Sequence, residues 1–292
     1  MVSIRALALA AALFSFAYAA PYSSDQNAPA ARAEHLKVDS SPTLTADVPV
    51  TLTRRSTGGV VTGGYAVNSI NNKDGIGAGS DSYIFYRGDG STGAGWPSKA
   101  KWVSFEDMWN NNKQQILTKS CGWNTWGPDN SAAEMQGIYD AIQQIATETK
   151  VDHRFILAVV VQESKGCVRV PTTPNADPNI RNPGLMQCHS GDGTCANTNP
   201  CPNSIITQMV REGTAGTNKG DGLAQVINPE AQKTFQNTNP DARVYYAAAK
   251  YYNGGSIPPS NNLEDGCCTK CYSSDIANRL TGWISAPSNC NL

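Results

Sequence analysis

The residue best suited to chemistry is a glutamate, Glu163, that follows a long apolar run. Residues 155–161 are all apolar, and Gln162 and Glu163 are the first polar side chains after them. A carboxyl group beside such a run is partly buried, and burial disfavours its charged form and raises its pKa. If the run is helical, the dipole at its C-terminal end acts in the same direction. Glu163 therefore suits a general acid, the alternative being an exposed glutamate in a last helical turn.

Three separated motifs occur in a fixed order along the chain. They are Ile156 to Ser164 (I-L-A-V-V-V-Q-E-S), Gly184 to Gln187 (G-L-M-Q) and Ala248 to Gly254 (A-A-K-Y-Y-N-G). Together they resemble the signature of goose-type lysozymes and lytic transglycosylases, in which a buried helix ends in Glu-Ser. The resemblance covers roughly residues 100–285 and implies a mainly helical, lysozyme-like domain with a buried central helix.

The resemblance also implies roles for individual residues. Glu163 would be the general acid, and Gln187 a polar contact in the cleft. Tyr252 would orient the acid or a sugar, and Asn253 would help to hold the end of its helix. The alternatives are structural: residues 184–186 as a packed turn, and Tyr252 as a core aromatic before a glycine helix stop.

A second carboxylate is expected to hold the attacking water. Asp177 lies seven residues before Gly184, and Asp192 lies five residues after Gln187. Inversion requires carboxyl groups about 6.5–9.5 Å apart, which leaves room for a water molecule. We favour Asp177, although the prolines around it are also typical of an aspartate that only forms a turn.

These features predict a glycoside hydrolase that cleaves a β-1,4-linked aminosugar polymer, with peptidoglycan as the expected substrate. Lytic transglycosylation is the main alternative, followed by hydrolysis of chitin or chitosan. A non-catalytic cell-wall-binding module is the alternative from another class. No cofactor or metal is implied, and the chain lacks the G-x-S-x-G motif of serine hydrolases.

Nine cysteines are typical of a disulfide-bonded exported protein. They are Cys121, Cys167, Cys188, Cys195, Cys201, Cys267, Cys268, Cys271 and Cys290. The odd number predicts four bridges and one remaining thiol. We expect Cys188 to bond Cys195 or Cys201. Because neighbouring cysteines rarely bond each other, we expect Cys267 and Cys268 to reach partners such as Cys121, Cys167 or Cys290.

The N-terminal residues predict export. Residues 1–19 have a basic start, a short apolar run and an Ala17-Tyr18-Ala19 cleavage site, which is the pattern of a signal peptide. Residues 20–55 hold few large apolar side chains and end in Arg54-Arg55, which indicates a pro-segment typical of a eukaryotic secretor such as a fungus. No later run is long enough to span a bilayer. A net charge of −1 disfavours nucleic acid as a partner. We therefore expect a secreted monomer.

The remaining chain divides in two. Residues 56–100 are rich in glycine and predict an irregular arm or a few short strands. Residues 101–292 predict the helical catalytic domain. Helices are expected over 105–117 after Ser104, to about Thr149 after Asn130 or Ser131, and after Asp152 as far as Gly166. Three more are expected near 204–213, 241–252 and 274–284.

Overall fold

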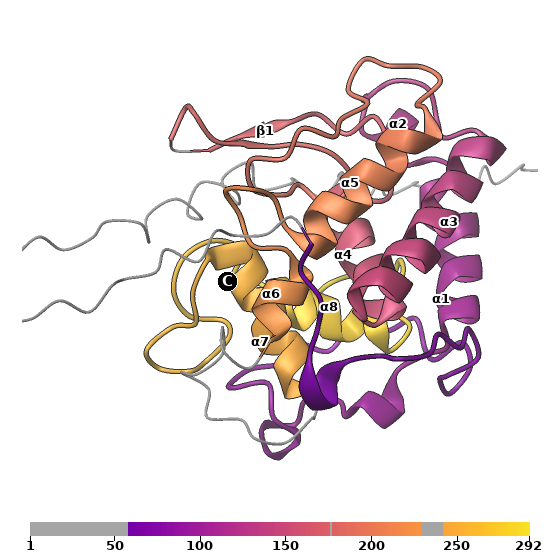
Figure 1. Cartoon of the computed structure of the whole chain (residues 1–292). Helices are drawn as coiled ribbons and strands as arrows, with labels where there is room; N and C mark the ends of the chain where they lie inside the picture. The colour runs from indigo at the N-terminus through magenta and orange to yellow at the C-terminus, as the bar shows by residue number, and fades with distance from the viewer. Residues whose placement is uncertain (1–57, 176, 229–241) are drawn as a thin grey trace, which may run out of the picture.

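The computed structural model describes residues 58–175, 177–228 and 242–292 (Figure 1). The predicted signal peptide and pro-segment lie outside these residues. The described part is mainly helical, as predicted, with one pair of very short strands. Its helices are α1 (Phe105–Asn112), α2 (Ser120–Trp123), α3 (Ala132–Thr149), α4 (His153–Ser164), α5 (Asn203–Ala215), α6 (Leu223–Ile227), α7 (Arg243–Gly254) and α8 (Tyr272–Leu280).

Helix α4 is the buried central helix that the apolar run predicts. It contacts α1, α3, α5 and α8, which surround it in the body of the molecule (Figure 1). Every α4 residue is buried except Gln162 and Glu163. Residues 155–161 are apolar on all sides of the helix and can be stable only inside a core, and the two polar residues that follow them are the two that are not fully buried.

Side-chain caps fix where the first long helices begin. The Ser104 hydroxyl accepts a hydrogen bond from the Asp107 amide, Ser131 forms a capping box with Glu134, and the Asp152 carboxylate caps α4. Helix α1 continues as a π-helical turn, Lys113–Leu117, so that the helical stretch ends where it was predicted to end. The left-handed conformation expected at Gly166 already begins one residue earlier, at Lys165.

The glycine-rich arm contains no strand among its described residues. Of the two expected forms, an irregular arm or a few short strands, the structure has the irregular arm, with 3₁₀ turns at Gly63–Tyr65, Thr92–Ala94 and Lys99–Lys101. Its backbone amides bond to the helical domain instead, for example Val61 N to Thr149 O at 2.8 Å. Val61 is buried in the same hydrophobic core as the helices. The arm is therefore packed onto the helical domain.

The two strands lie elsewhere, in the segment that carries Asp177. Strand β1 (Thr173–Pro174) pairs antiparallel with β2 (Arg181–Asn182), and Thr173 is opposite Asn182. This hairpin projects from the helical body (Figure 1). It leads directly into the Gly184–Gln187 segment.

Three disulfides cross-link the described chain. They join Cys121 to Cys167, Cys195 to Cys201, and Cys271 to Cys290. The predicted bond from Cys188 to Cys195 or Cys201 was wrong, because those two cysteines bond each other. Cys267 and Cys268 likewise do not reach Cys121, Cys167 or Cys290, all of which have other partners.

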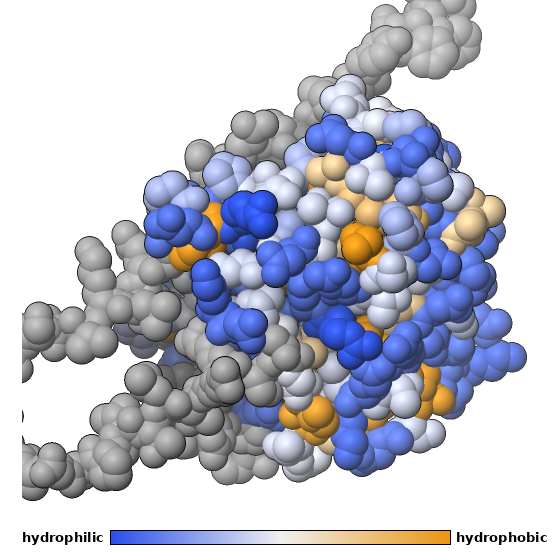
Figure 2. Space-filling model, turned by 45° about the horizontal axis from the view of Figure 1, so that its top comes forward, coloured by the Kyte–Doolittle hydropathy of each residue, from blue (hydrophilic) through white to orange (hydrophobic). Residues whose placement is uncertain are grey.

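The surface has no large apolar face in the view of Figure 2, where hydrophobic residues occur singly among hydrophilic ones. Among the described residues, none of the helices combines the length and the apolar character needed to cross a membrane.

Candidate active site

The Glu163 carboxyl is held by a tyrosine from another helix. Glu163 is half-buried at the C-terminal end of α4, and its Oε1 accepts a hydrogen bond of 2.5 Å from the Tyr272 hydroxyl. Tyr272 is the first residue of α8 and is buried. A short hydrogen bond to a buried donor fixes the orientation of the carboxyl group, which proton transfer in a defined direction requires.

Helix α8 also holds the neighbouring residue, Gln162. The Gln162 amide donates to Asp275 Oδ2 at 3.0 Å, and its carbonyl oxygen accepts from Arg279 Nε at 2.8 Å. The other Asp275 oxygen accepts from the Tyr83 hydroxyl of the arm at 2.6 Å. Tyr272, Asp275 and Arg279 follow one another at spacings of three and four, so they share one face of α8. That face supports the exposed end of α4.

Burial shifts the protonation equilibria around this network. Burial raises the pKa of Asp275 against the opposing effects of Tyr83 and Arg279. Burial lowers the pKa of Lys165 to about 7; the Arg279 charge adds to this, and Asp275 and Glu163 oppose it. A buried carboxyl and a half-buried lysine with a lowered pKa therefore lie close to Glu163.

The Gly184–Gln187 segment is tied to both the hairpin and α7. Gln187 Oε1 accepts from the Thr173 hydroxyl at 2.7 Å, and its amide donates to the carbonyls of Pro171 and Gly184. The Tyr252 hydroxyl, in the buried part of α7, donates to the Met186 carbonyl at 2.8 Å. These contacts show Gln187 and Tyr252 holding the segment in place.

Asn253 links the end of α7 to the start of α8. Its Oδ1 accepts from the backbone amide of Thr269 at 3.0 Å, and the Tyr272 amide in turn donates to the Thr269 carbonyl. Asn253 thus lies at the end of α7 and contacts the connection that leads into α8. The third motif is thereby joined to the tyrosine that bonds Glu163.

Among the described residues, the contacts of Asp177 and Asp192 lie outside the network around Glu163. The Asp177 Oδ1 accepts from the backbone and side-chain amides of Asn179, both at 2.9 Å, which is an aspartate-stabilised turn at the hairpin tip. The Asp192 side chain is 84% exposed and lies 3.8 Å from Arg181. It lines a pocket of about 310 Å³ together with Arg211 and Lys219, which Glu163 does not line.

An exposed tryptophan lies on the segment bonded to the end of α4. Trp123 is 60% exposed on α2. The Cys121–Cys167 disulfide attaches α2 four residues beyond Glu163, and the Asn130 amide donates to Gly166 O at 2.8 Å. The disulfide therefore ties the helix that carries Trp123 to the chain just beyond α4.

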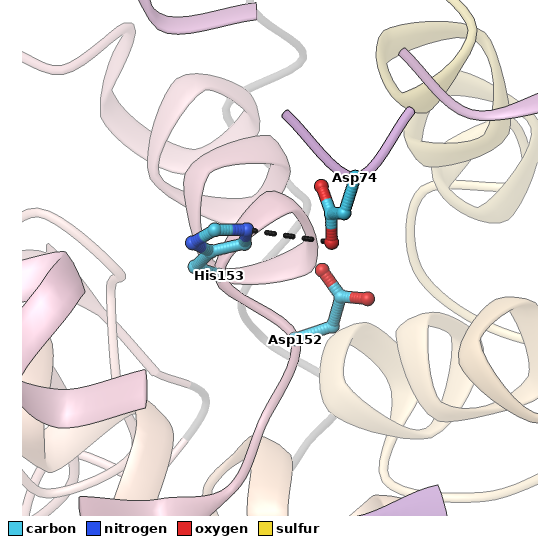
Figure 3. Close-up of side chains that lie close together, drawn as sticks. All are labelled: Asp74, Asp152 and His153. Atoms are coloured by element: carbon cyan, nitrogen blue, oxygen red, sulfur yellow. Dashed lines mark ion pairs between the residues drawn. The ribbon is translucent and has the colours of Figure 1, made fainter. Parts of the chain in front are cut away.

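One cluster resembles a metal site at the opposite, N-terminal end of α4. Ligand atoms of Asp74, Asp152 and His153 lie within 4.8 Å of one another (Figure 3). However, the Asp152 carboxylate forms ion pairs with Arg154, at 2.8 Å, and with Lys99, at 2.9 Å. Burial alone would raise the pKa of Asp152, but these two cations lower it. The cluster is an ion-pair clamp between the arm and α4, because the Asp152 carboxylate is paired with both cations and Asp74 Oδ2 lies 3.4 Å from Arg154.

Sequence reasoning did not find Tyr272, Asp275 or Arg279. The only signal was an expected helix near 274–284, which includes Asp275 and Arg279 at helical spacing but begins two residues after Tyr272. The helix predicted a shared face, but which neighbour that face contacts depends on packing between distant segments.

Comparison with known proteins gives no assignment: no model of a protein family matches the chain, and no curated protein matches it. The likeness to goose-type lysozymes and lytic transglycosylases therefore rests on the three sequence motifs alone.

Proposed function

We propose that the protein is a secreted glycoside hydrolase that cleaves a β-1,4-linked aminosugar polymer, with Glu163 as general acid. The observation that carries the proposal is the environment of Glu163. It is one of only two α4 residues that are not fully buried, and its carboxyl is fixed by Tyr272 at 2.5 Å.

In the proposed reaction, Glu163 protonates the oxygen of the scissile glycosidic bond while positive charge develops on the sugar ring. Tyr272 keeps the carboxyl oriented. The face of α8 that carries Asp275 and Arg279 keeps the end of α4 in place. Tyr252, Gln187 and Asn253 act indirectly in this proposal, by holding the segments around Glu163.

Peptidoglycan is the proposed substrate. The exposed Trp123 suits a polysaccharide, because an indole face packs against the apolar face of a pyranose ring while its surroundings remain wet. The three disulfides fit an enzyme that acts outside the cell.

A lytic transglycosylase is the second candidate, and one observation favours it. The Asp177 carboxylate bonds its own turn, and the Asp192 side chain is almost fully exposed. In a transglycosylase the substrate supplies its own nucleophile, so no second carboxylate is required.

Product analysis tests both candidates. Purified peptidoglycan is digested with the secreted protein, and the fragments are identified by mass spectrometry, with chitin in parallel. New reducing ends from peptidoglycan support hydrolysis, and anhydro ends support transglycosylation. Cleavage of chitin alone would show that chitin, and not peptidoglycan, is the substrate. Intact polymers in both digests would contradict the proposal.

A further inference from the structure

The sulfur atoms of two adjacent cysteines, Cys267 and Cys268, are in close contact. The Sγ atoms of Cys267 and Cys268 lie 2.7 Å apart. A disulfide bond is about 2.0 Å long, so only a small rotation of either side chain separates this contact from a bond. The pair is near the surface. Six of the other cysteines are already bonded in the three disulfides.

The backbone at this pair is suited to the bond. Adjacent Cα atoms are about 3.8 Å apart, which is shorter than the span of an ordinary disulfide. Bonding therefore requires an unusual backbone conformation. Cys268 has φ +74°, in the left-handed region that residues other than glycine rarely adopt.

The pair also lies in the connection between two helices of the candidate site. The Cys267 Sγ is 3.5 Å from Gly254 O at the end of α7, and the buried Lys250 ammonium donates to Cys267 O at 3.1 Å. The next residue, Thr269, donates to Asn253 and accepts from the Tyr272 amide. The conformation of this turn thus affects where α8 begins and where the Tyr272 hydroxyl lies.

We propose that Cys267 and Cys268 form a disulfide with each other in the exported protein, and that this bond sets the turn that positions Tyr272. In forming it, the two thiols lose two protons and two electrons. A disulfide oxidant, either a small molecule or a protein, takes up the electrons and becomes two thiols. The bond brings the disulfides to four, with Cys188 as the ninth cysteine. Because adjacent residues strain the bond, it is reduced before the other three.

The covalent claim is tested without any assay of activity. The secreted protein is denatured without reductant, alkylated, digested and mapped by mass spectrometry. The expected peptide contains Cys267 and Cys268 unalkylated and joined to each other. Alkylation of both residues, or a bond from either one to another cysteine, overturns the proposal.

A graded reduction then tests the lability of the bond. Folded protein is treated with increasing concentrations of a thiol reductant and alkylated at each step. Cys267 and Cys268 should be labelled at a lower concentration than the buried Cys121 and Cys167. Simultaneous labelling of both pairs contradicts the strained bond.

The effect on Tyr272 rests on the proposed function, so it is measured separately. Mild reduction should lower peptidoglycan turnover by about tenfold, less than the ~10²-fold cost of a 1 Å misplacement. The C267S/C268S variant should start at the lower rate and no longer respond to the reductant. A variant that matches the oxidised wild type would show that the bond does not position Tyr272. If the wild type has no activity, the proposed function fails, while the mass map still decides whether the bond exists.

Discussion

The Tyr272 hydroxyl donates a 2.5 Å hydrogen bond to Glu163 Oε1 and thereby joins the first residue of α8 to the exposed end of the buried helix α4. Two segments that are far apart in the chain meet at this contact. Under the proposed function, the contact gives Tyr272 the role of positioning the Glu163 carboxyl. Kinetic measurements can separate this role from any contribution of Tyr272 to the stability of the fold.

Tyr272→Phe removes the hydroxyl and keeps the ring. A hydrogen bond to a charged group contributes about 1.5–3 kcal/mol, so we expect kcat to fall by about ten- to a hundredfold. KM should change little, because the hydroxyl acts on the acid. Steady-state kinetics on soluble peptidoglycan fragments measure both constants.

Tyr139→Phe is the matched control, since its hydroxyl bonds Asn72 near the other end of α4. It should leave kcat unchanged. Equal losses in the two variants would show that Tyr272 acts only through stability.

Trp123→Ala should weaken substrate binding. Loss of an exposed stacking surface is expected to raise KM about five- to twentyfold, equivalent to about 1–2 kcal/mol, with kcat nearly constant. Ile84→Ala is the control, because Ile84 is similarly exposed, at 53%. An unchanged KM for Trp123→Ala would remove this residue from the substrate site.

Asp74→Asn should loosen the clamp between the arm and α4. Its carboxylate lies 3.4 Å from Arg154 and 3.7 Å from His153, both buried. The free energy of unfolding should fall by about 1–3 kcal/mol in chemical denaturation. Lys73→Met breaks an exposed ion pair with Glu106 and should cost about 0–1 kcal/mol. The reverse order of the two effects would contradict the clamp.

Lys165 should make stability depend on pH. Its pKa falls from 10.5 to about 7 on folding, mainly through burial. Between these values the unfolded chain binds the proton and the folded chain does not, so the wild type gains stability as pH rises from 7 towards 10.5. Below pH 7 Lys165 is charged in both the folded and the unfolded chain, and the wild type then loses the full free energy that burying this charge costs.

Lys165→Met should therefore be more stable than the wild type at about pH 6, and the difference should shrink at about pH 9. Urea denaturation at both pH values measures it. The exposed Lys101→Met variant corrects for the change in net charge. A difference that stays constant with pH would contradict the burial of the Lys165 charge.

The sequence predicted local features of the fold more successfully than distant contacts. Ser104, Ser131 and Asp152 cap helices at the predicted positions, because a cap and the apolar period that follows it act within a few residues. The pattern of the arm left open whether it is irregular or forms short strands. It is irregular because its amides bond to the helical domain, and local pattern does not reveal that partner.

The same distinction applies to the site. Glu163 could be singled out because the apolar run before it is visible in the sequence. Tyr272 could not, since its contact depends on how α8 packs against α4 across more than a hundred residues. Cys188 was assigned a wrong partner for a similar reason, because its candidate partners lie closer to each other in the fold.

The most direct test of the account is the rate of Glu163→Gln on purified peptidoglycan. Glutamine keeps the size of the side chain and an oxygen that can accept from Tyr272, but it has no proton to donate. The account predicts a loss of ~10²-fold or more, with circular dichroism and thermal midpoint unchanged. Glu148→Gln, at an exposed position on α3, should retain full activity. Retention of more than about a tenth of the wild-type rate by Glu163→Gln would contradict the assignment of Glu163 as the general acid.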